Sequence, residues 1–212
     1  MRAISAISFS YAANSLQSRG LSLLDRHLGF RRLYNMSDFD IPLCYSNKPD
    51  GVVPPGVAKF DRTLGESDAW VFAIAEAGGH YCAAFKNIMD WLIVKNRFNS
   101  QLGEGYSLSG KPVYVFTFTP TYEGAGDRHF ELTKYILAQK FGADVRGMFV
   151  LNRCWENVVP GNQEFVRTQA EAIGADLARA SDASVAQAPV LAKYDVEKWV
   201  RQYEAWDRQW TE

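Results

Sequence analysis

Short runs of β-branched and aromatic residues alternate along this chain with longer segments in which apolar residues recur every three or four positions. The β-rich runs are Arg2–Ser8, Phe30–Asn35, Ala69–Ala75, Pro112–Thr119 and Asp144–Leu151. Pro112–Thr119 is almost continuously apolar or β-branched, as is typical of a strand buried on both faces. We therefore expect five strands.

Three of the intervening segments have the period of an amphipathic helix. Their apolar positions are Leu16, Leu23, Leu24 and Leu28 in the first, Phe85, Ile88, Met89, Leu92 and Ile93 in the second, and Leu132, Ile136 and Leu137 in the third. Gly142 is expected to end the third helix. Alternating strands and helices predict an α/β fold with right-handed crossovers, a flavodoxin-like, doubly wound parallel sheet in the order 2-1-3-4-5.

Three stretches show neither pattern, namely Met36–Pro55, Lys95–Gly110 and the Ala/Ser-rich Arg179–Pro189. The last is interpreted as a linker. We expect a flavodoxin-like domain over residues 1–178, a linker over 179–192 and an amphipathic C-terminal helix over 193–212. One face of that helix carries Val196, Trp199, Tyr203, Trp206 and Trp210. This face either packs on its own domain or contacts a partner subunit, where Trp and Tyr are enriched.

The composition is typical of a globular protein and limits the classes of partner that the protein can bind. The 212 residues are 47% hydrophobic and carry a formal net charge of −1. That charge produces no field that would attract nucleic acid or an anionic membrane. The sequence shows neither a signal-peptide core nor a run of about 18 apolar residues. The three cysteines form no disulfide or zinc spacing, so we expect a reducing, cytoplasmic setting.

Ligands of doubly wound sheets bind outside the carboxyl ends of the strands, where the strand order reverses. The first strand is followed by Ser8-Phe9-Ser10-Tyr11-Ala12-Ala13-Asn14-Ser15, and a helix then begins. Hydroxyls and free N–H groups at a helix N-terminus suit a phosphate. The alternative is that Asn14 or Ser15 simply caps the helix.

Two further loops belong to the same edge. The loop after the third strand contains Gly78-Gly79, and paired glycines permit close approach of the backbone to a flat ring. The loop after the fourth strand, Thr119–Gly126, is polar and rich in glycine. Its Gly124-Ala125-Gly126 is no dinucleotide fingerprint, because the third glycine is missing and the position is wrong.

The segment Phe85-Lys86-Asn87-Ile88-Met89-Asp90-Trp91-Leu92 resembles the signature of the NADPH-dependent FMN reductase family, the flavodoxin-like NAD(P)H:quinone and FMN oxidoreductases. Asp38-Phe39-Asp40-Ile41-Pro42-Leu43 resembles that family's segment after the second strand. Weaker similarity extends from residue 1 to about 178.

The resemblance implies FMN and NAD(P)H as cofactors, a small-molecule electron acceptor, and a homodimer or tetramer. The flavin carries the chemistry, so no catalytic acid or base is expected. The implied phosphate contacts are Ser8, Ser10, Asn14 and Ser15. The implied contacts of the isoalloxazine ring are Glu76, Ala77, Gly78, Gly79 and His80 on one side and Thr119, Tyr122 and Gly124 on the other.

The chain departs from the family pattern at these loops. The family's Gly-Ser-x-Arg-x-x-Ser is replaced at Ile7, Ser10 and Ala13, and its Tyr-Asn pair by Ala77-Gly78. Loss of the Arg and Tyr contacts costs about 2–4 kcal/mol, or about 30- to 1,000-fold in the FMN dissociation constant. A flavodoxin-like scaffold that has lost catalysis is therefore one alternative, and a flavodoxin-style electron carrier is another. The near-neutral charge disfavours the carrier.

Other candidate residues receive plainer interpretations. His80 and Cys82 lack further ligands for a metal. Cys82 is expected to be a small packing residue rather than a reactive thiolate, although a helix N-terminus lowers thiol pKa values. His129 is expected to be exposed or capping. Trp91 is assigned to the core or an interface, and Lys86, Asn87 and Asp90 to structural contacts.

Overall fold

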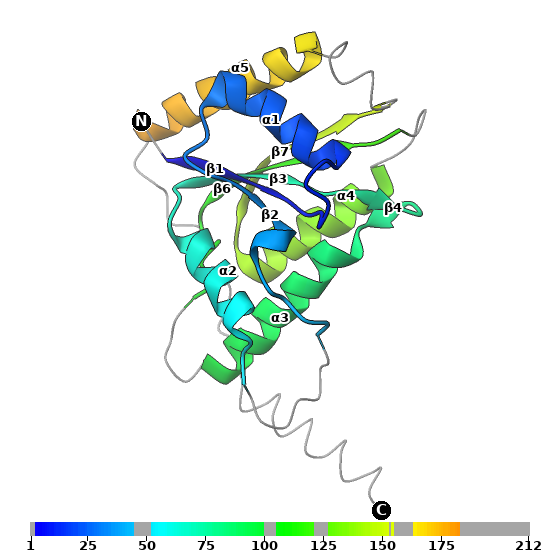
Figure 1. Cartoon of the computed structure of the whole chain (residues 1–212). Coiled ribbons are helices and arrows are strands. Elements are labelled where there is room, and N and C mark those ends of the chain that lie inside the picture. The colour runs from blue at the N-terminus through cyan, green and yellow to red at the C-terminus, as the bar shows by residue number, and fades with distance from the viewer. Residues whose placement is uncertain are drawn as a thin grey trace, which may run out of the picture.

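A parallel five-stranded sheet forms the centre of the protein in the computed structural model, which describes residues 3–44, 52–99, 105–120, 127–152, 154 and 163–182 (Figure 1). The strands are β1 (Ile4–Ser8), β2 (Leu33–Asn35), β3 (Ala69–Ala73), β6 (Pro112–Phe118) and β7 (Asp144–Leu151). Their order is β2-β1-β3-β6-β7, and every pair is parallel. The predicted fold class and strand order are confirmed.

Helices cover both faces of the sheet (Figure 1). One face carries α1 (Leu16–Leu28) and α5 (Gln163–Asp182), and the other carries α2 (Pro55–Gly65), α3 (Ala83–Asn99) and α4 (Asp127–Lys134). The short 3-10 helix η1 (Met36–Asp38) follows β2, and the π-helix η3 (Tyr135–Lys140) continues α4. A separate antiparallel hairpin, β4 (Glu76–Ala77) and β5 (His80–Tyr81), lies between β3 and α3. Each face of the sheet has its own buried apolar cluster.

Local sequence explains where the helices begin and end. Ser15 is the N-cap of α1, and Gly29 ends that helix in the left-handed conformation at φ 61°. Gly142 adopts φ 67° directly after Phe141, the C-cap of η3, so the predicted stop is confirmed. The second helix begins at Pro55, where a fixed φ and a missing N–H are tolerated.

Three expectations need correction. Lys95 belongs to α3, which continues to Asn99, and Arg179 belongs to α5, which continues to Asp182. In α5 the Ala-rich sequence favours the helical state even where its polarity suggests a loop. Leu132 is 43% exposed rather than part of the apolar face, because the buried side of this helix runs through His129, Thr133 and Leu137 at intervals of four residues.

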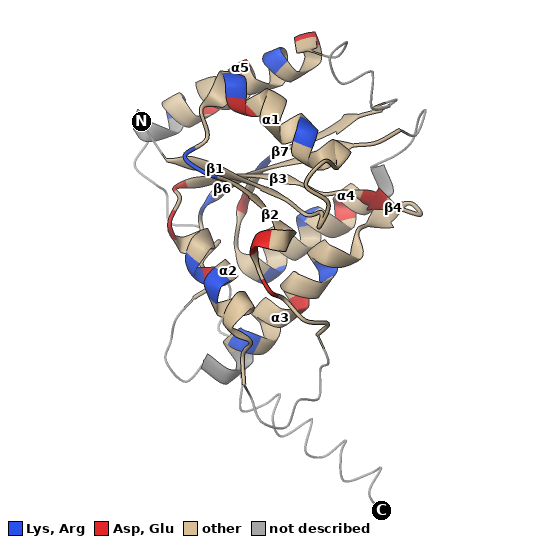
Figure 2. Ribbon diagram, in the orientation of Figure 1, with Lys and Arg blue, Asp and Glu red and all other residues tan. Residues whose placement is uncertain are grey.

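Charged residues are distributed over the helices of both layers, whereas the central strands are largely uncharged (Figure 2). The positive and negative side chains nearly balance, since the formal net charge is −1. Among the described helices, none combines the length and apolarity needed to cross a bilayer. The expected C-terminal helix over 193–212 and most of the expected linker lie outside the described residues.

Candidate functional site

The carboxyl ends of three neighbouring strands bring the candidate loops to one edge of the sheet. Ser8 of β1 is in register with Ala73 of β3, and Ala73 with Phe116 of β6. The loop after β1, the β4–β5 hairpin and the segment that begins at Thr119 therefore emerge side by side. This edge is where ligands of doubly wound sheets bind.

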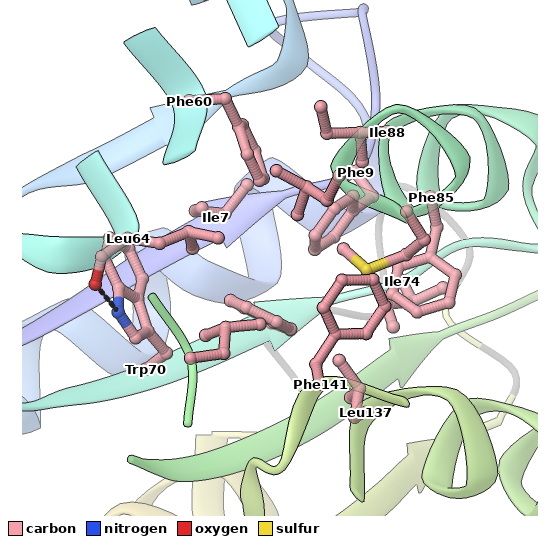
Figure 3. Close-up of a cluster of buried hydrophobic side chains, with 14 of the residues drawn as sticks. Ile7, Phe9, Phe60, Leu64, Trp70, Ile74, Phe85, Ile88, Leu137 and Phe141 are labelled. Atoms are coloured by element: carbon pink, nitrogen blue, oxygen red, sulfur yellow. Dashed lines mark hydrogen bonds between the residues drawn. The ribbon is translucent and has the colours of Figure 1, made fainter. Parts of the chain in front are cut away.

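The loop after β1 is anchored by an aromatic side chain. Phe9 is 1% exposed, and its ring centroid lies 5.1 Å from that of Phe72 and 5.2 Å from that of Phe85. Figure 3 shows Phe9 beside Phe85. Its N–H donates to the Ala73 carbonyl at 2.8 Å. Its own carbonyl accepts from the Cys82 thiol at 3.2 Å. Phe9 thus connects the first loop to the base of the hairpin. The sequence offered a sign of this role, because Phe9 is an apolar residue within an otherwise polar loop.

Two of the predicted phosphate ligands turn inward. Ser8 is fully buried, and its Oγ lies 3.0 Å from the Ser18 Oγ, which also donates to Asn35 Oδ1 at 2.6 Å. The Ser15 Oγ accepts from the Ser18 N–H at 3.1 Å, so Ser15 caps α1. These hydroxyls join β1, α1 and β2 beneath the loop. The structure therefore favours the capping interpretation for Ser15.

The outer side of the loop retains groups suited to an anion. Asn14 is exposed, and the Leu16 and Gln17 N–H groups belong to the first turn of α1, where a helix offers them no backbone acceptor. The Ser18 N–H is already bonded to the Ser15 Oγ and the Arg19 N–H to the Ser15 carbonyl. The positive end of the helix dipole reinforces this site. Ser10 takes part in a local turn, because its Oγ accepts from the Ala12 N–H at 3.2 Å.

The β4–β5 hairpin presents an open surface next to a buried acceptor. Gly78 and Gly79 connect the two strands at φ 61° and 81°, a two-residue turn that requires positive φ at both positions. A Cβ built on either glycine meets no atom within 4 Å, so the space beside the turn is open. The Glu76 Oε2 is buried without a hydrogen-bond partner among the described residues. An imide N–H, such as isoalloxazine carries, would satisfy it.

The remaining predicted residues are placed only in part. Thr119 is buried, its N–H donates to the Leu151 carbonyl at 3.0 Å and its carbonyl accepts from the Cys154 N–H at 2.8 Å. Tyr122 and Gly124 lie outside the described residues. Asn152, just after β7, has a buried Oδ1 without a partner in the described part of the chain. Asn152 was not among the predicted site residues, because it belongs to no recognisable sequence motif.

Burial determines the character of the Cys82 thiol. Desolvation raises its pKa above the ordinary value, despite nearby backbone N–H groups that lower it. The thiol donates to the Phe9 carbonyl rather than facing outward as a thiolate. The interpretation of Cys82 as a packing residue agrees with this geometry. Tyr11 lies near it, and burial, followed by the effect of Cys82, raises the Tyr11 pKa.

His129 is fully buried, so the expectation of an exposed or capping residue was wrong. Its Nε2 lies 3.1 Å from the Thr117 Oγ1, and its Nδ1 lies 3.4 Å from the Thr133 Oγ1. Desolvation lowers its pKa, and the nearby His80 lowers it further. Because a hydroxyl group lies beside each ring nitrogen, the imidazole can be buried in the protein interior. The position of His129 in the sequence alone did not reveal these partners.

The two segments that carry the family resemblance contact each other. The Pro42 carbonyl accepts from Asn87 Nδ2 at 3.0 Å and from the Trp91 indole N–H at 2.8 Å. The Cys44 N–H donates to Asn87 Oδ1 at 2.7 Å. Trp91 is buried, and Lys86 pairs with Asp90 on the surface of α3. The structural roles predicted for these residues are confirmed, and they fix the segment after β2 against α3.

Comparison with known proteins agrees with this architecture. The family model for NADPH-dependent FMN reductase matches residues 4–156. Among solved structures, the flavoenzyme NAD(P)H:acceptor oxidoreductase FerB from Paracoccus denitrificans aligns with a TM-score of 0.55 and 19% identity, over 81% of this chain and 96% of FerB. The NAD(P)H:quinone oxidoreductase from Methanothermobacter marburgensis aligns with a TM-score of 0.56 and 14% identity, over 80% and 97% of the two chains.

An FMN-dependent NADH-azoreductase from Bacillus anthracis, solved with FMN, aligns with a TM-score of 0.52 and 9% identity, over 80% of this chain and 98% of the azoreductase. Among curated proteins, no sequence matches. At these identities the structural likeness concerns the fold, whereas the family model covers most of the chain. The chain belongs to the NADPH-dependent FMN reductase family, which confirms the resemblance. It is therefore a flavin-dependent oxidoreductase in general class, with FMN and NAD(P)H as the cofactors of its family.

Proposed function

We propose that this protein is an NAD(P)H oxidoreductase that binds FMN at the carboxyl edge of its sheet and reduces a small acceptor of the quinone type. The observation that carries the proposal is the open hairpin turn at Gly78-Gly79 beside the unpaired Glu76 Oε2. A buried carboxylate oxygen without a partner is costly, and a ligand N–H would remove that cost.

The residues proposed to hold FMN divide into two groups. Asn14, Ser10 and the N–H groups at the start of α1 face the phosphate, while Ser8 and Ser15 support the loop from inside. The hairpin residues 76–80 would line the ring, and Thr119, Tyr122 and Gly124 are the contacts that the family resemblance implies for its other edge. Bound FMN would take up hydride from NAD(P)H and pass electrons on to the acceptor.

The chain itself contributes position rather than proton transfer. The hairpin is held at its base, because the Cys82 N–H donates to the Ala75 carbonyl at 2.9 Å. The first loop is held by Phe9. A preorganised site of this kind fixes the distance and angle between reacting partners, which is the contribution expected where a cofactor supplies the chemistry.

The named neighbours support a small-molecule acceptor. FerB is described as an NAD(P)H:acceptor oxidoreductase, the Methanothermobacter protein as a quinone oxidoreductase and the Bacillus protein as an azoreductase. We extend to this chain the general pattern of a small conjugated acceptor. A cytoplasmic homodimer or tetramer without nucleic-acid or membrane partners remains our proposal, supported by the near-neutral charge and the cysteine spacing.

One observation favours the alternative of a scaffold that has lost catalysis. The Ser8 and Ser15 hydroxyls are committed to Ser18, so the phosphate would depend on backbone groups, Ser10 and Asn14. Such a site holds FMN less tightly than one with an Arg.

The test is the rate of NADPH and NADH oxidation by the purified chain with a small quinone, with and without added FMN. The proposal expects protein-dependent turnover that saturates with FMN and exceeds that of free FMN. A rate equal to that of free FMN and quinone alone would support the scaffold instead.

A further inference from the structure

A buried chain of hydrogen bonds connects α4 to the start of the β4–β5 hairpin. The Thr117 Oγ1 on β6 lies 3.0 Å from the Ile74 carbonyl oxygen and 3.1 Å from His129 Nε2. The Thr133 Oγ1 lies 3.4 Å from His129 Nδ1. Thr117, His129 and Thr133 are fully buried, so water does not replace these contacts.

The donors and acceptors of this chain define one arrangement of protons. A carbonyl oxygen only accepts, so the single hydroxyl proton of Thr117 goes to Ile74. Thr117 must then accept from His129, which places the imidazole proton on Nε2. The unprotonated Nδ1 accepts from the Thr133 hydroxyl. Because desolvation lowers its pKa, His129 is then a neutral Nε2–H tautomer with both ring nitrogens satisfied.

We propose that His129 is a positioning residue that holds the hairpin of the flavin site in place through Thr117 and the Ile74 carbonyl. Ile74 is the first residue beyond β3, and its N–H donates to the Phe116 carbonyl at 2.8 Å. The Thr117 hydroxyl therefore secures the other side of the same residue, where the backbone leaves the sheet. The next residue, Ala75, accepts the bond from Cys82 that closes the hairpin.

Two observations independent of these bonds place His129 next to the hairpin. The helix α4 packs against β5, the second strand of the hairpin. His80 on β5 is near enough to His129 to disfavour a second positive charge there. The side chain of Ile74 is buried beside Phe9 and Phe85, so its backbone is anchored in the core that also carries the first loop (Figure 3).

The inference that the hairpin serves FMN rests on the proposed function, but the positioning itself is tested without flavin. Amide hydrogen exchange of residues 75–82 is compared with that of β3, residues 69–73, in the full chain and in two matched pairs of variants. Thr117→Val and His129→Leu remove a link, whereas Thr117→Ser keeps the hydroxyl and His129→Gln keeps an N–H donor.

The proposal expects about fivefold to tenfold faster exchange at 75–82 in Thr117→Val and His129→Leu, as loss of one buried hydrogen bond implies, with β3 unchanged. The two conservative variants should stay near wild type. Nitrogen NMR of wild-type His129 should show a neutral ring protonated at Nε2. Hairpin exchange that is unaltered in Thr117→Val or in His129→Leu, or a ring protonated at Nδ1, would overturn the inference.

FMN affinity of the same variants separates this inference from the proposed function. If wild type binds FMN, Thr117→Val should weaken binding by about fivefold or more, and Thr117→Ser should not. Equal affinity in Thr117→Val and wild type would show that the link does not act on the site. A wild type that does not bind FMN would refute the proposed function, and the exchange result would still decide whether His129 positions the hairpin.

Discussion

Replacing Ser10 by arginine tests the loop that is proposed to hold the FMN phosphate. Ser10 stands where the family pattern has an arginine, and its side chain is partly exposed at the mouth of the loop. An arginine here would place a guanidinium near the first turn of α1. The loop itself is anchored by the buried Phe9 and by the Ser10 carbonyl, which accepts from the Met36 N–H at 3.2 Å.

Two opposing contributions determine the expected change in FMN affinity. A guanidinium–phosphate contact contributes about 1.5–3 kcal/mol. The substitution removes the bond between Ser10 Oγ and the Ala12 N–H, which costs about 0.5–1.5 kcal/mol. The net gain centres on about 1.25 kcal/mol, so Ser10→Arg is expected to bind FMN close to tenfold more tightly.

The assay is a titration that follows quenching of FMN fluorescence, at low and at moderate salt. Ser10→Ala measures the cost of the lost turn bond alone. Ser22→Arg adds the same charge to the exposed surface of α1, away from the loop, and controls for the net charge. A tenfold gain in Ser10→Arg without a gain in Ser22→Arg supports the phosphate site. Unchanged or weaker binding by Ser10→Arg refutes the alignment of this loop.

Four further outcomes follow from the same contacts. Phe9→Ala should lower the free energy of unfolding by about 3–5 kcal/mol in denaturant titrations, and a loss below about 1 kcal/mol would contradict its anchoring role. Gly79→Ala should weaken FMN binding, because the φ of Gly79 is 81°. Gly65→Ala should not, because the space around Gly65 is equally open and its φ is not positive. Equal FMN affinity of the two variants in flavin titrations would argue against a role of the turn in binding. Lys111→Met should lower the free energy of unfolding by about 2–3 kcal/mol in thermal unfolding, since Lys111 Nζ donates to the carbonyls of Leu64, Gly65 and Ser67. An unchanged midpoint would show that these bonds contribute little. Because burial lowers the pKa of His129, the unfolded state takes up the proton first as pH falls below about 6.5. Unfolding free energy should thus decline more steeply with falling pH in wild type than in His129→Gln, and parallel curves would refute this.

The central strands of the sheet were predictable because they are buried on both faces and therefore have continuous apolar sequences. Pro112–Phe118 is buried at every position, and the neighbouring strand Ala69–Ala73 is as well. The helix α2 was not predicted, because it begins at the end of a stretch whose Pro54-Pro55 suggests a loop. Its buried Val57, Phe60 and Leu64 nevertheless carry a helical period.

The edge of the sheet that carries the candidate loops was predictable, whereas the direction of their side chains was not. Topology alone places the loops after β1, β3 and β6 at one edge. Whether Ser8 faces a ligand or Ser18 depends on how α1 packs, and that information is tertiary. His129 illustrates the same limit, since its burial depends on Thr117, twelve residues away on a strand.

The central claim, that FMN binds this chain and is reduced there by NAD(P)H, is tested most directly by an absorbance spectrum. The purified full-length chain is mixed with FMN, freed of unbound flavin, and measured without oxygen before and after NADPH is added. The account predicts flavin bands that remain with the protein and bleach with NADPH. Protein that retains no flavin and consumes no NADPH would contradict it.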